Sequence, residues 1–191
     1  MNNDITSAIR PAIVMTILFA LLLGLAYPLA MVGFGQAIFP AQANGSLVTD
    51  GGKVIGSTVV GQAFTAPRYF NTRPSAAGKG YDGLASSGSN YGPTSQALAD
   101  RVKTDVAAAK RSAPGISIPA DLVTASASGL DPDLSPEAAF FQVPRIARVR
   151  GLSEDRIKTL VTQHIDHPIL GFLGEPHVNV LSLNRALDGL R

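Results

Sequence analysis

The chain has 191 residues, of which 46% are hydrophobic and only 16% are charged. That length fits one domain with a membrane anchor and is short for two full domains. The net charge of +2, without a block of Lys and Arg, gives no indication of nucleic-acid binding. The absence of cysteine excludes disulfides and thiolate metal sites.

The low charge has its source in one segment near the N-terminus. Residues 11–49 contain no Asp, Glu, Lys, Arg or His, and Ala12–Gly35 is apolar apart from Thr16 and Tyr27. As a helix, residues 12–35 would span about 36 Å, which exceeds a hydrocarbon core of ~30 Å. We therefore predict a transmembrane helix over residues 12–35, in which Pro28 introduces a tolerated kink.

A cleaved signal peptide is the alternative interpretation of this segment. Ala41-Gln42-Ala43 has the small residues of a cleavage site. The apolar stretch is much longer than a signal peptide's, which runs roughly 7–15 residues. Length therefore favours an uncleaved anchor.

The charges that flank the span predict its orientation. Arg10 and the terminal amine, partly offset by Asp4, lie on one side, and the first basic residue on the other side is Lys53. The positive-inside rule then places residues 1–11 in the cytoplasm and residues 36–191 outside, in a single-pass protein of the inner (plasma) membrane. Because the span carries no charged residue, the chain is not itself a channel or a pump.

Small residues recur at helical spacing within the span, at Ala20 and Gly24 and again at Ala26 and Ala30. Such spacing lets a second helix approach closely, so Ala20 and Gly24 are candidate contacts with a partner helix. Ala and Gly are also frequent in membrane helices generally, and the pattern alone leaves both readings open.

The first part of the outer domain is predicted to be poor in regular structure. Two strands, Leu47–Thr49 and Lys53–Val60, flank a Gly-rich turn. Residues 62–92 are rich in turn formers, and a polar loop of that length is functional or disordered. A helix is expected to open at Pro93-Thr94, with Leu98, Val102 and Val106 on one face.

The second part reads as helices with one short strand. Ser135-Pro136-Glu137 begins a helix that Pro144 should kink or end and Gly151 should stop. A further helix begins at Ser153, with one apolar face formed by Ile157, Leu160, Val161 and Ile165. Val178–Val180 is a predicted strand, and a last helix runs through Leu187. The fold class is α+β: one transmembrane helix followed by one small extracytoplasmic α+β domain.

No catalytic signature is present: there is no phosphate-binding loop, paired-histidine metal helix or nucleophile elbow. His164 and His167 have the spacing of two ligands on one helix face, but without a third ligand a solvated helix end is favoured over a metal site. Near Gln142, the basic residues Arg145 and Arg148 are either a docking surface for anionic groups or favourable charges at a helix C-terminus.

Several motifs in a fixed order resemble one family, the C subunit of the Kdp-type potassium-transporting ATPase of bacteria and archaea. The resemblance covers nearly the whole chain, and Pro144 within the stretch from Gln142 to Arg145 departs from the family's pattern. The motifs are Arg10-Pro11, Gly61–Phe64, Tyr69-Phe70, Arg73–Ala76, Ser87–Asn90, Asp121–Pro132, Ser135-Pro136, Gln142-Val143, Arg150–Leu152, Gly174–Pro176, Val178–Leu181 and Leu187-Asp188.

The resemblance implies an accessory, non-catalytic subunit that is needed for assembly of a potassium uptake pump. Its partners would be a channel-like subunit that translocates potassium and a P-type ATPase subunit that hydrolyses ATP, with membrane lipid around the anchor. The chain agrees with this division of labour, since it lacks the phosphorylation motif Asp-Lys-Thr-Gly-Thr. Ser87, Gly88, Ser89 and Asn90, in the uncharged part of the polar loop, are candidate contacts with the channel-like subunit.

An alternative role implied by the resemblance is that of a catalytic chaperone. In that role the subunit raises the ATPase subunit's affinity for ATP, and a glutamine matching Gln142 contacts the nucleotide. The orientation predicted above puts Gln142 across the bilayer from cytosolic ATP, which favours the assembly role. An anchored extracytoplasmic enzyme or ligand sensor is a further alternative, but the sequence supplies no convergent set of catalytic groups.

Overall fold

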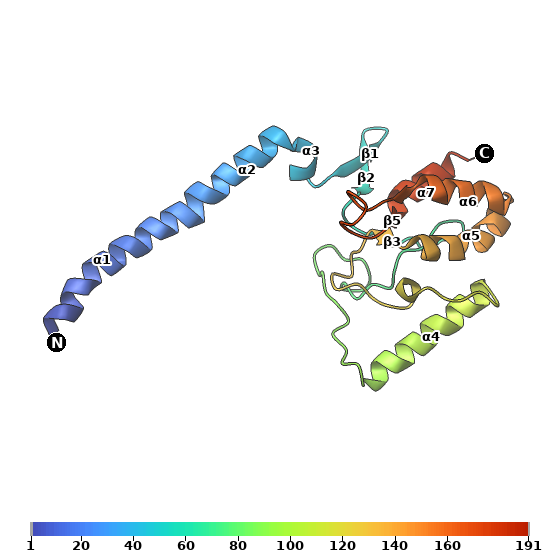
Figure 1. The fold of residues 1–191 in the computed structure, drawn as a ribbon, viewed down its shortest axis with the longest axis horizontal. Coiled ribbons are helices and arrows are strands. Elements are labelled where there is room, and N and C mark those ends of the chain that lie inside the picture. Colours follow the sequence, from blue (N-terminus) through green and yellow to red (C-terminus); the bar gives the residue numbers. More distant parts are fainter. Residues whose placement is uncertain (1, 191) are drawn as a thin grey trace. The chain divides into compact units, whose positions relative to one another are not determined.

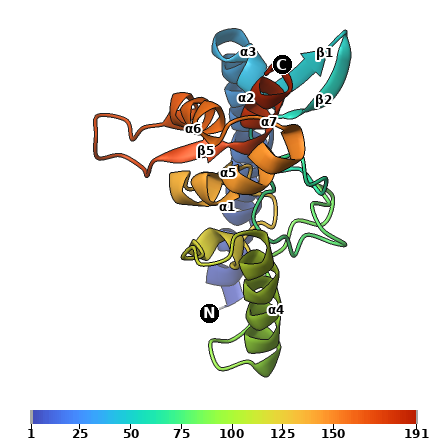
Figure 2. The same cartoon turned by 90° about the vertical axis from the view of Figure 1, so that its right-hand side faces the viewer.

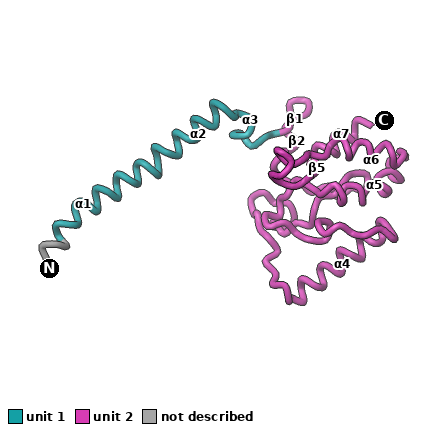
Figure 3. Tube along the Cα trace, viewed as in Figure 1, with its two compact units in different colours: residues 1–47 teal, residues 48–191 magenta. Residues whose placement is uncertain are grey.

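The computed structural model describes residues 2–190 and divides at Leu47/Val48 into two compact units, shown in different colours in Figure 3. The first unit is a long helix followed by a short one. The second unit contains all the buried residues and every strand except the start of β1.

The long helix of the first unit consists of α1 (Asn2–Leu21), the π-helical turn η1 (Leu22–Ala26) and α2 (Tyr27–Ile38), and α3 (Pro40–Ala43) follows. Residues 6–38 are long and apolar enough to cross a membrane, with a mean hydropathy of 2.3 and no buried residue in that window. The hydroxyl of Thr16 donates to the carbonyl of Ala12 at 2.8 Å, which satisfies this polar group within the helix. One N-terminal apolar helix as a candidate span therefore agrees with the prediction, although the helix itself extends beyond residues 12–35.

The π-helical turn lies just before Pro28 and has a local physical cause. Proline lacks an N–H group, and its ring crowds the carbonyl four residues earlier, here that of Gly24. The N–H of Tyr27 bonds to the carbonyl of Leu22, one residue further back than in an α-helix. This wider turn makes room for the proline ring, and the helix continues through it.

The second unit is an α+β domain, as predicted. It begins with a hairpin of β1 (Leu47–Asp50) and β2 (Lys53–Ser57), whose turn residues Gly51 and Gly52 have φ of 55° and 80°. A long irregular stretch then leads to the remaining elements, shown in Figure 1. They are α4 (Gln96–Ser112), the 3-10 turn η2 (Ala120–Leu122), β3 (Asp133–Leu134), α5 (Pro136–Arg150), α6 (Glu154–Gln163), β4 (Ile165–Asp166), β5 (His177–Asn179) and α7 (Val180–Asp188).

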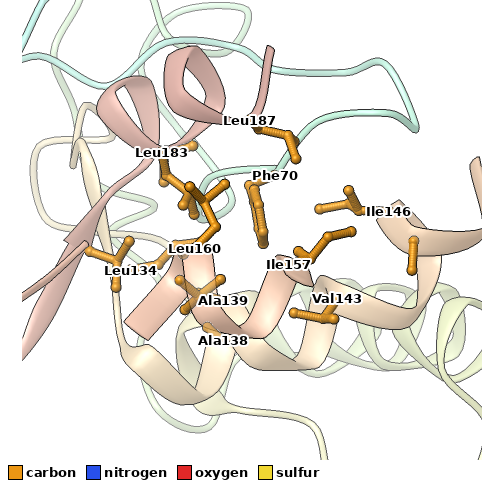
Figure 4. Packing of buried hydrophobic residues seen from close by; sticks show 14 residues of the cluster. Phe70, Leu134, Ala138, Ala139, Val143, Ile146, Ile157, Leu160, Leu183 and Leu187 are labelled. Carbon is orange, nitrogen blue, oxygen red and sulfur yellow. The ribbon is translucent and has the colours of Figure 1, made fainter. Parts of the chain in front are cut away.

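A small antiparallel sheet and three helices form the core of this unit. The strand order is β3-β5-β4, and Val178 at the centre pairs with Leu134 on one side and Ile165 on the other. Helices α5, α6 and α7 pack beside one another, and Figure 4 shows their apolar side chains gathered around Phe70. Phe70, which comes from the irregular stretch, is completely buried. The core therefore includes a side chain from an irregular segment as well as those of the helices and strands.

Helix α4 contributes little to this core. It begins after Ser95, slightly later than predicted, and none of its residues is buried. Leu98, Val102 and Val106 are half-buried along one face, which agrees with the predicted stripe. Figures 1 and 2 both show α4 apart from α5, α6 and α7.

Helix α5 excludes one of two predicted effects of Pro144. The proline was expected to kink or end the helix, and it does not end it, because α5 continues from Pro136 to Arg150. Its ends are as predicted: the hydroxyl of Ser135 caps the N-terminus by accepting from the N–H of Ala138 at 3.1 Å, and Gly151 ends the helix with φ of 67°. Packing of the buried face of α5 outweighs the one helical hydrogen bond that proline removes.

Two boundaries also differ from the sequence expectation. Ile165 was expected on the apolar face of the helix that begins after Ser153, but α6 ends at Gln163 and Ile165 lies in β4. Val180 was expected in a strand and instead begins α7. The cause in each case is the three-stranded sheet, whose two-residue outer strands leave no periodicity to detect.

Candidate functional site

Side chains of two helices hold the segment Arg68–Asn71 of the second unit, which we call the clamped segment. Its two last residues are held by amide side chains of two helices. Asn184 of α7 accepts from the N–H of Phe70 at 2.8 Å and donates to the carbonyl of Phe70 at 3.0 Å. Gln142 of α5 accepts from the N–H of Asn71 at 2.8 Å and donates to its carbonyl at 2.9 Å.

These amides take the place of a neighbouring strand. An extended segment leaves its N–H and C=O groups free, and burying them unpaired would cost free energy. A side-chain amide offers one donor and one acceptor at the right separation to pair with both. Gln142 and Asn184 are 5% and 2% exposed, so both clamps lie inside the protein.

The hydrogen-bonding capacity of Gln142 is used within the chain. Besides the clamp, its amide nitrogen donates to the carbonyl of Ala138 at 3.3 Å, and its oxygen accepts from Arg145 at 2.6 Å. A glutamine amide has two N–H donors and an oxygen with two lone pairs. The side chain therefore has no unused donor or acceptor for a ligand in this conformation.

Arg145 points at the same segment. Its guanidinium also donates to the side-chain oxygen of Asn71 at 2.7 Å and to the carbonyl of Pro67. Burial lowers the pKa of Arg145 below its ordinary value, because a desolvated cation is less stable. The group remains charged at any physiological pH, so its hydrogen bonds are charge-assisted.

A second polar group holds the other end of the clamped segment. Arg150 of α5 bonds to the carbonyl of Arg68 at 2.9 Å and forms an ion pair with Asp188 of α7 at 2.6 Å. The same carboxylate accepts from the hydroxyl of Tyr69 at 2.9 Å, and the guanidinium of Arg150 lies 5.2 Å from the centroid of the Tyr69 ring. The Tyr69–Arg150–Asp188 group therefore links α5 and α7 to the clamped segment.

The polar loop that follows is fastened to the turn at residues 126–131. The N–H of Ser87 and the hydroxyl of Ser86 both donate to the carbonyl of Ser128, each at 3.0 Å. Gly129 has φ of 68°, and a Cβ there would lie 2.6 Å from the N of Ala77. Only glycine allows this close approach of two backbones.

The start of the polar loop has its own anchors. Arg73 forms an ion pair with Asp131 at 2.8 Å, and the hydroxyl of Ser75 donates to the carbonyl of Gly129 at 2.6 Å. The Tyr81 hydroxyl donates to the carbonyl of Arg73, and burial raises the pKa of that phenol above its ordinary value of 10.0. The loop therefore lies against the domain at both ends.

The residues predicted as partner contacts fall into two structural classes. Ala20, Gly24 and Arg148 are exposed, and a Cβ on Gly24 would meet no atom of this chain within 4 Å. Ser87, Gly88 and Ser89 are half-buried, Asn90 is exposed with φ of 53°, and Arg145 is directed inward. The predicted residues of the second unit have different environments, because Arg145 belongs to the clamp, whereas Ser87 and Gly88 lie against the turn at 126–131.

The two histidines do not share a helix face, which corrects the geometry assumed for them. His164 caps the C-terminus of α6, its Nδ1 lies 2.8 Å from the carbonyl of Leu160, and His167 follows β4. Within residues 2–190, no group of three His, Cys, Asp or Glu side chains is placed to hold a metal ion.

A polar cavity of about 280 Å³ lies beside Gln142, between α5 and the C-terminal half of α4. Asn71, Asp105, Gln142 and Arg145 are among its lining residues. The carboxylate of Asp105 faces the same space as the guanidinium, so the cavity offers no uncompensated positive charge to a phosphate. A polyphosphate would meet a carboxylate there as well as a cation.

Sequence reasoning missed the roles of Asn184, Asp188 and Tyr69. Tyr69 and Asp188 belong to motifs that carried the family resemblance and Asn184 does not, but a lone polar residue in an apolar pattern does not reveal its partner. It also missed the apolar loop between β4 and β5. Five of the seven residues between His167 and Glu175 are Pro, Ile, Leu or Phe, and this concentration of apolar side chains could have indicated the loop.

Comparisons with known proteins give a consistent result. The model of the family described as KdpC, K+-transporting ATPase, c chain, matches residues 9–189. The chain is 58% identical over 183 residues to a potassium-transporting ATPase KdpC subunit of Caulobacter vibrioides, which covers 95% of this chain and 93% of the relative. It is 53% identical over 195 residues to the KdpC subunit of Rhodopseudomonas palustris, with 96% and 98% covered. With nearly the whole chain matched on both sides, it belongs to the KdpC family, the c chains of the K+-transporting ATPase.

Proposed function

We propose that this chain is an accessory, non-catalytic subunit of an ATP-driven potassium uptake pump, needed to assemble and stabilise the complex. The observation that carries the proposal is the use of its buried polar side chains. Gln142, Asn184, Arg145 and Arg150 form hydrogen bonds to groups of the chain itself, and those of Gln142 use all its donors and acceptors. Such a domain is built to present a rigid surface.

The partners in this proposal are the channel-like subunit and the P-type ATPase subunit of the same complex. The relatives are named as subunits of a potassium-transporting ATPase, which supports a role inside such an assembly. The chain is single-pass, with its N-terminus in the cytoplasm and the second unit outside. The absence of Asp, Glu, Lys, Arg and His from residues 11–49, with Arg10 before them, supports this orientation.

Two contact surfaces follow from this role. In the membrane, Ala20 and Gly24 would let a partner helix approach closely, since nothing of this chain covers Gly24. Outside, Ser87–Asn90 and Arg148 would meet the channel-like subunit. Arg145 is the weaker candidate, because its guanidinium is engaged with Asn71 and Pro67.

The alternative function is a catalytic chaperone in which Gln142 contacts ATP. The cavity beside Gln142 is the feature that favours it, since it is lined by an arginine and two amides. Two observations weigh against it: the amide of Gln142 is fully bonded, and Asp105 lines the same cavity. The proposed orientation would also separate the cavity from the cytosol. ATP is therefore assigned to another subunit.

The proposal is tested by removing the second unit and keeping the anchor. A chain that ends after Leu47 is expressed with the other subunits, and the complex is purified from detergent through a tag on the ATPase subunit. We expect loss of the intact complex and of potassium-stimulated ATP hydrolysis, while the ATPase subunit alone still becomes phosphorylated by ATP. Normal recovery and activity with the shortened chain would contradict the accessory role.

A further inference from the structure

The loop between β4 and β5 presents four large apolar side chains to solvent. Ile169, Leu170, Phe172 and Leu173 are 71%, 78%, 73% and 53% exposed. We call Pro168–Gly174 the apolar hairpin; Figure 2 shows it as the orange loop that projects between α6 and β5. The domain buries side chains of the same kind elsewhere, such as Phe70, Ile157 and Leu183, and a cluster of four left exposed is typical of a surface that meets a partner.

Internal hydrogen bonds hold the apolar hairpin in a defined shape. Ile169 and Leu173 exchange two backbone bonds, of 3.1 and 3.0 Å, and the N–H of Gly171 bonds to the carbonyl of Pro168 at 3.0 Å. The loop is thus a closed turn and not an unstructured connector. A preformed turn loses little conformational entropy when it binds.

The backbone conformation of Leu170 is a second indication that this loop has a binding role. Its φ is 56°, in the left-handed region that a leucine rarely occupies. Glycine would be the favourable residue at this position, because it has no Cβ to clash. The chain carries a bulky apolar side chain there instead, and the turn directs that side chain into solvent.

The charges around the apolar hairpin indicate which kind of surface covers it. Residues 165–178 contain no Lys, Arg, Trp or Tyr, the residues that anchor loops at membrane surfaces. Asp166 and Glu175 flank the turn on its two sides. Glu175 also lines a cavity of about 450 Å³ at the base of the hairpin, with the carboxylates of Asp121, Asp131 and Asp133. Arg73, which is paired with Asp131, and His177 line it too, so carboxylates outnumber the basic groups. An anionic lipid surface would repel this base.

We propose that the apolar hairpin is a docking plug, which inserts into an apolar pocket with a basic rim on a partner subunit of the potassium-transporting complex. The pocket receives Leu170 and Phe172, and the rim faces Asp166 and Glu175. Complementary charge at the rim fixes the orientation, and the apolar tip supplies the contact area. This inference rests on the accessory role proposed above, because it needs a partner subunit on the same side of the membrane.

The first test separates docking from folding by two substitutions in the full-length chain. Leu170→Gly removes the exposed side chain and suits the observed φ, so the melting temperature of the chain should stay the same or rise. Phe172→Ala removes the second exposed group. Both should reduce recovery of the intact complex from detergent several-fold. Ile116→Ala, at an apolar side chain that is 46% exposed in another loop, is the matched control and should assemble normally.

The second test identifies the occupant. Benzoylphenylalanine replaces Phe172 in the complex in native membranes, and the products of illumination are identified by peptide mass spectrometry. A cross-link to another subunit of the potassium-transporting complex supports the proposal. A phospholipid adduct, a dimer of this chain or the absence of any product would overturn it.

The outcome also distinguishes the plug from the accessory role itself. If the hairpin variants assemble normally but the chain ending after Leu47 does not, the plug is refuted and the accessory role stands. If the shortened chain also assembles normally, the accessory role fails.

Discussion

Replacing Gln142 by alanine is the most informative single change, because it distinguishes a structural clamp from a nucleotide contact. The substitution removes both bonds that Gln142 makes to the backbone of Asn71, at 2.8 and 2.9 Å, together with the acceptor for Arg145. Arg145 keeps its bonds to Pro67 and to the side chain of Asn71. The N–H and C=O groups of Asn71 are the ones left without partners.

The size of the effect follows from those two backbone groups. A buried polar group that loses its partner costs about 1–3 kcal/mol, so the pair should lower the free energy of unfolding by about 2–6 kcal/mol. Asn71 is half-buried, which allows water to reach part of the space and favours the lower end of that range. Since small domains are stable by only about 5–15 kcal/mol, the loss should be easy to measure.

Urea unfolding of the full-length chain in detergent, followed by circular dichroism, measures this loss. Gln142→Glu keeps an acceptor for Asn71 and Arg145 but loses the donor, so it should fall between alanine and the wild type. Gln163→Ala removes an exposed glutamine from the end of α6 and should change little. The comparison isolates the clamp from the general effect of removing an amide.

The same variant is then assayed in the complex. We expect a fall in complex recovery and an unchanged ATP concentration for half-maximal activity. An unchanged unfolding midpoint together with a several-fold rise in that ATP concentration would refute the clamp argument and favour the chaperone role.

Four further predictions concern other parts of the chain. Gly24→Leu should leave the stability of the isolated chain unchanged, because no atom of this chain lies near Gly24. It should reduce co-purification of partner subunits, because the leucine side chain would keep a partner helix from approaching closely. Gly129→Ala should lower the free energy of unfolding by about 2 kcal/mol or more, whereas Gly115→Ala, whose φ is also positive but whose Cβ meets no atom within 4 Å, reports the backbone strain alone. Burial raises the pKa of Asp133 above its ordinary value of 3.8, so the folded chain binds this proton more tightly than the unfolded chain. The ionised carboxylate therefore destabilises the folded chain once the pH rises through the raised pKa. Asp133→Asn should raise the melting temperature at pH 7 and not below pH 3.8. Protease added outside spheroplasts should digest the second unit, and protection of that unit would reverse the proposed orientation.

The elements with local causes were predictable from the sequence. The long apolar helix near the N-terminus follows from the uncharged stretch of residues 11–49, and both ends of α5 follow from the cap at Ser135 and the glycine at Gly151. The Gly51-Gly52 hairpin turn and the apolar stripe of α4 were also predicted. In each case the signal and the structure lie within a few residues of each other, so neighbouring side chains suffice to indicate the outcome.

Where local preference conflicts with packing, the sequence alone did not decide the outcome. Pro144 is a helix breaker by its own chemistry, yet α5 continues through it because Val143 and Ile146 on either side are completely buried. The strands β3 and β4 are two residues long and exist only because β5 lies between them. A sequence window that sees one strand at a time does not reveal either.

The candidate sites depended most on the tertiary structure. Motifs in the sequence indicated the resemblance to one family. They did not indicate the role of Gln142, since its hydrogen-bonding partner Asn71 lies 71 positions earlier. Asn184 meets Phe70 across 114 positions. The side chain of each residue was known from the sequence alone, whereas its hydrogen-bonding partner was decided when long loops closed and burial required every backbone N–H and C=O group to be paired.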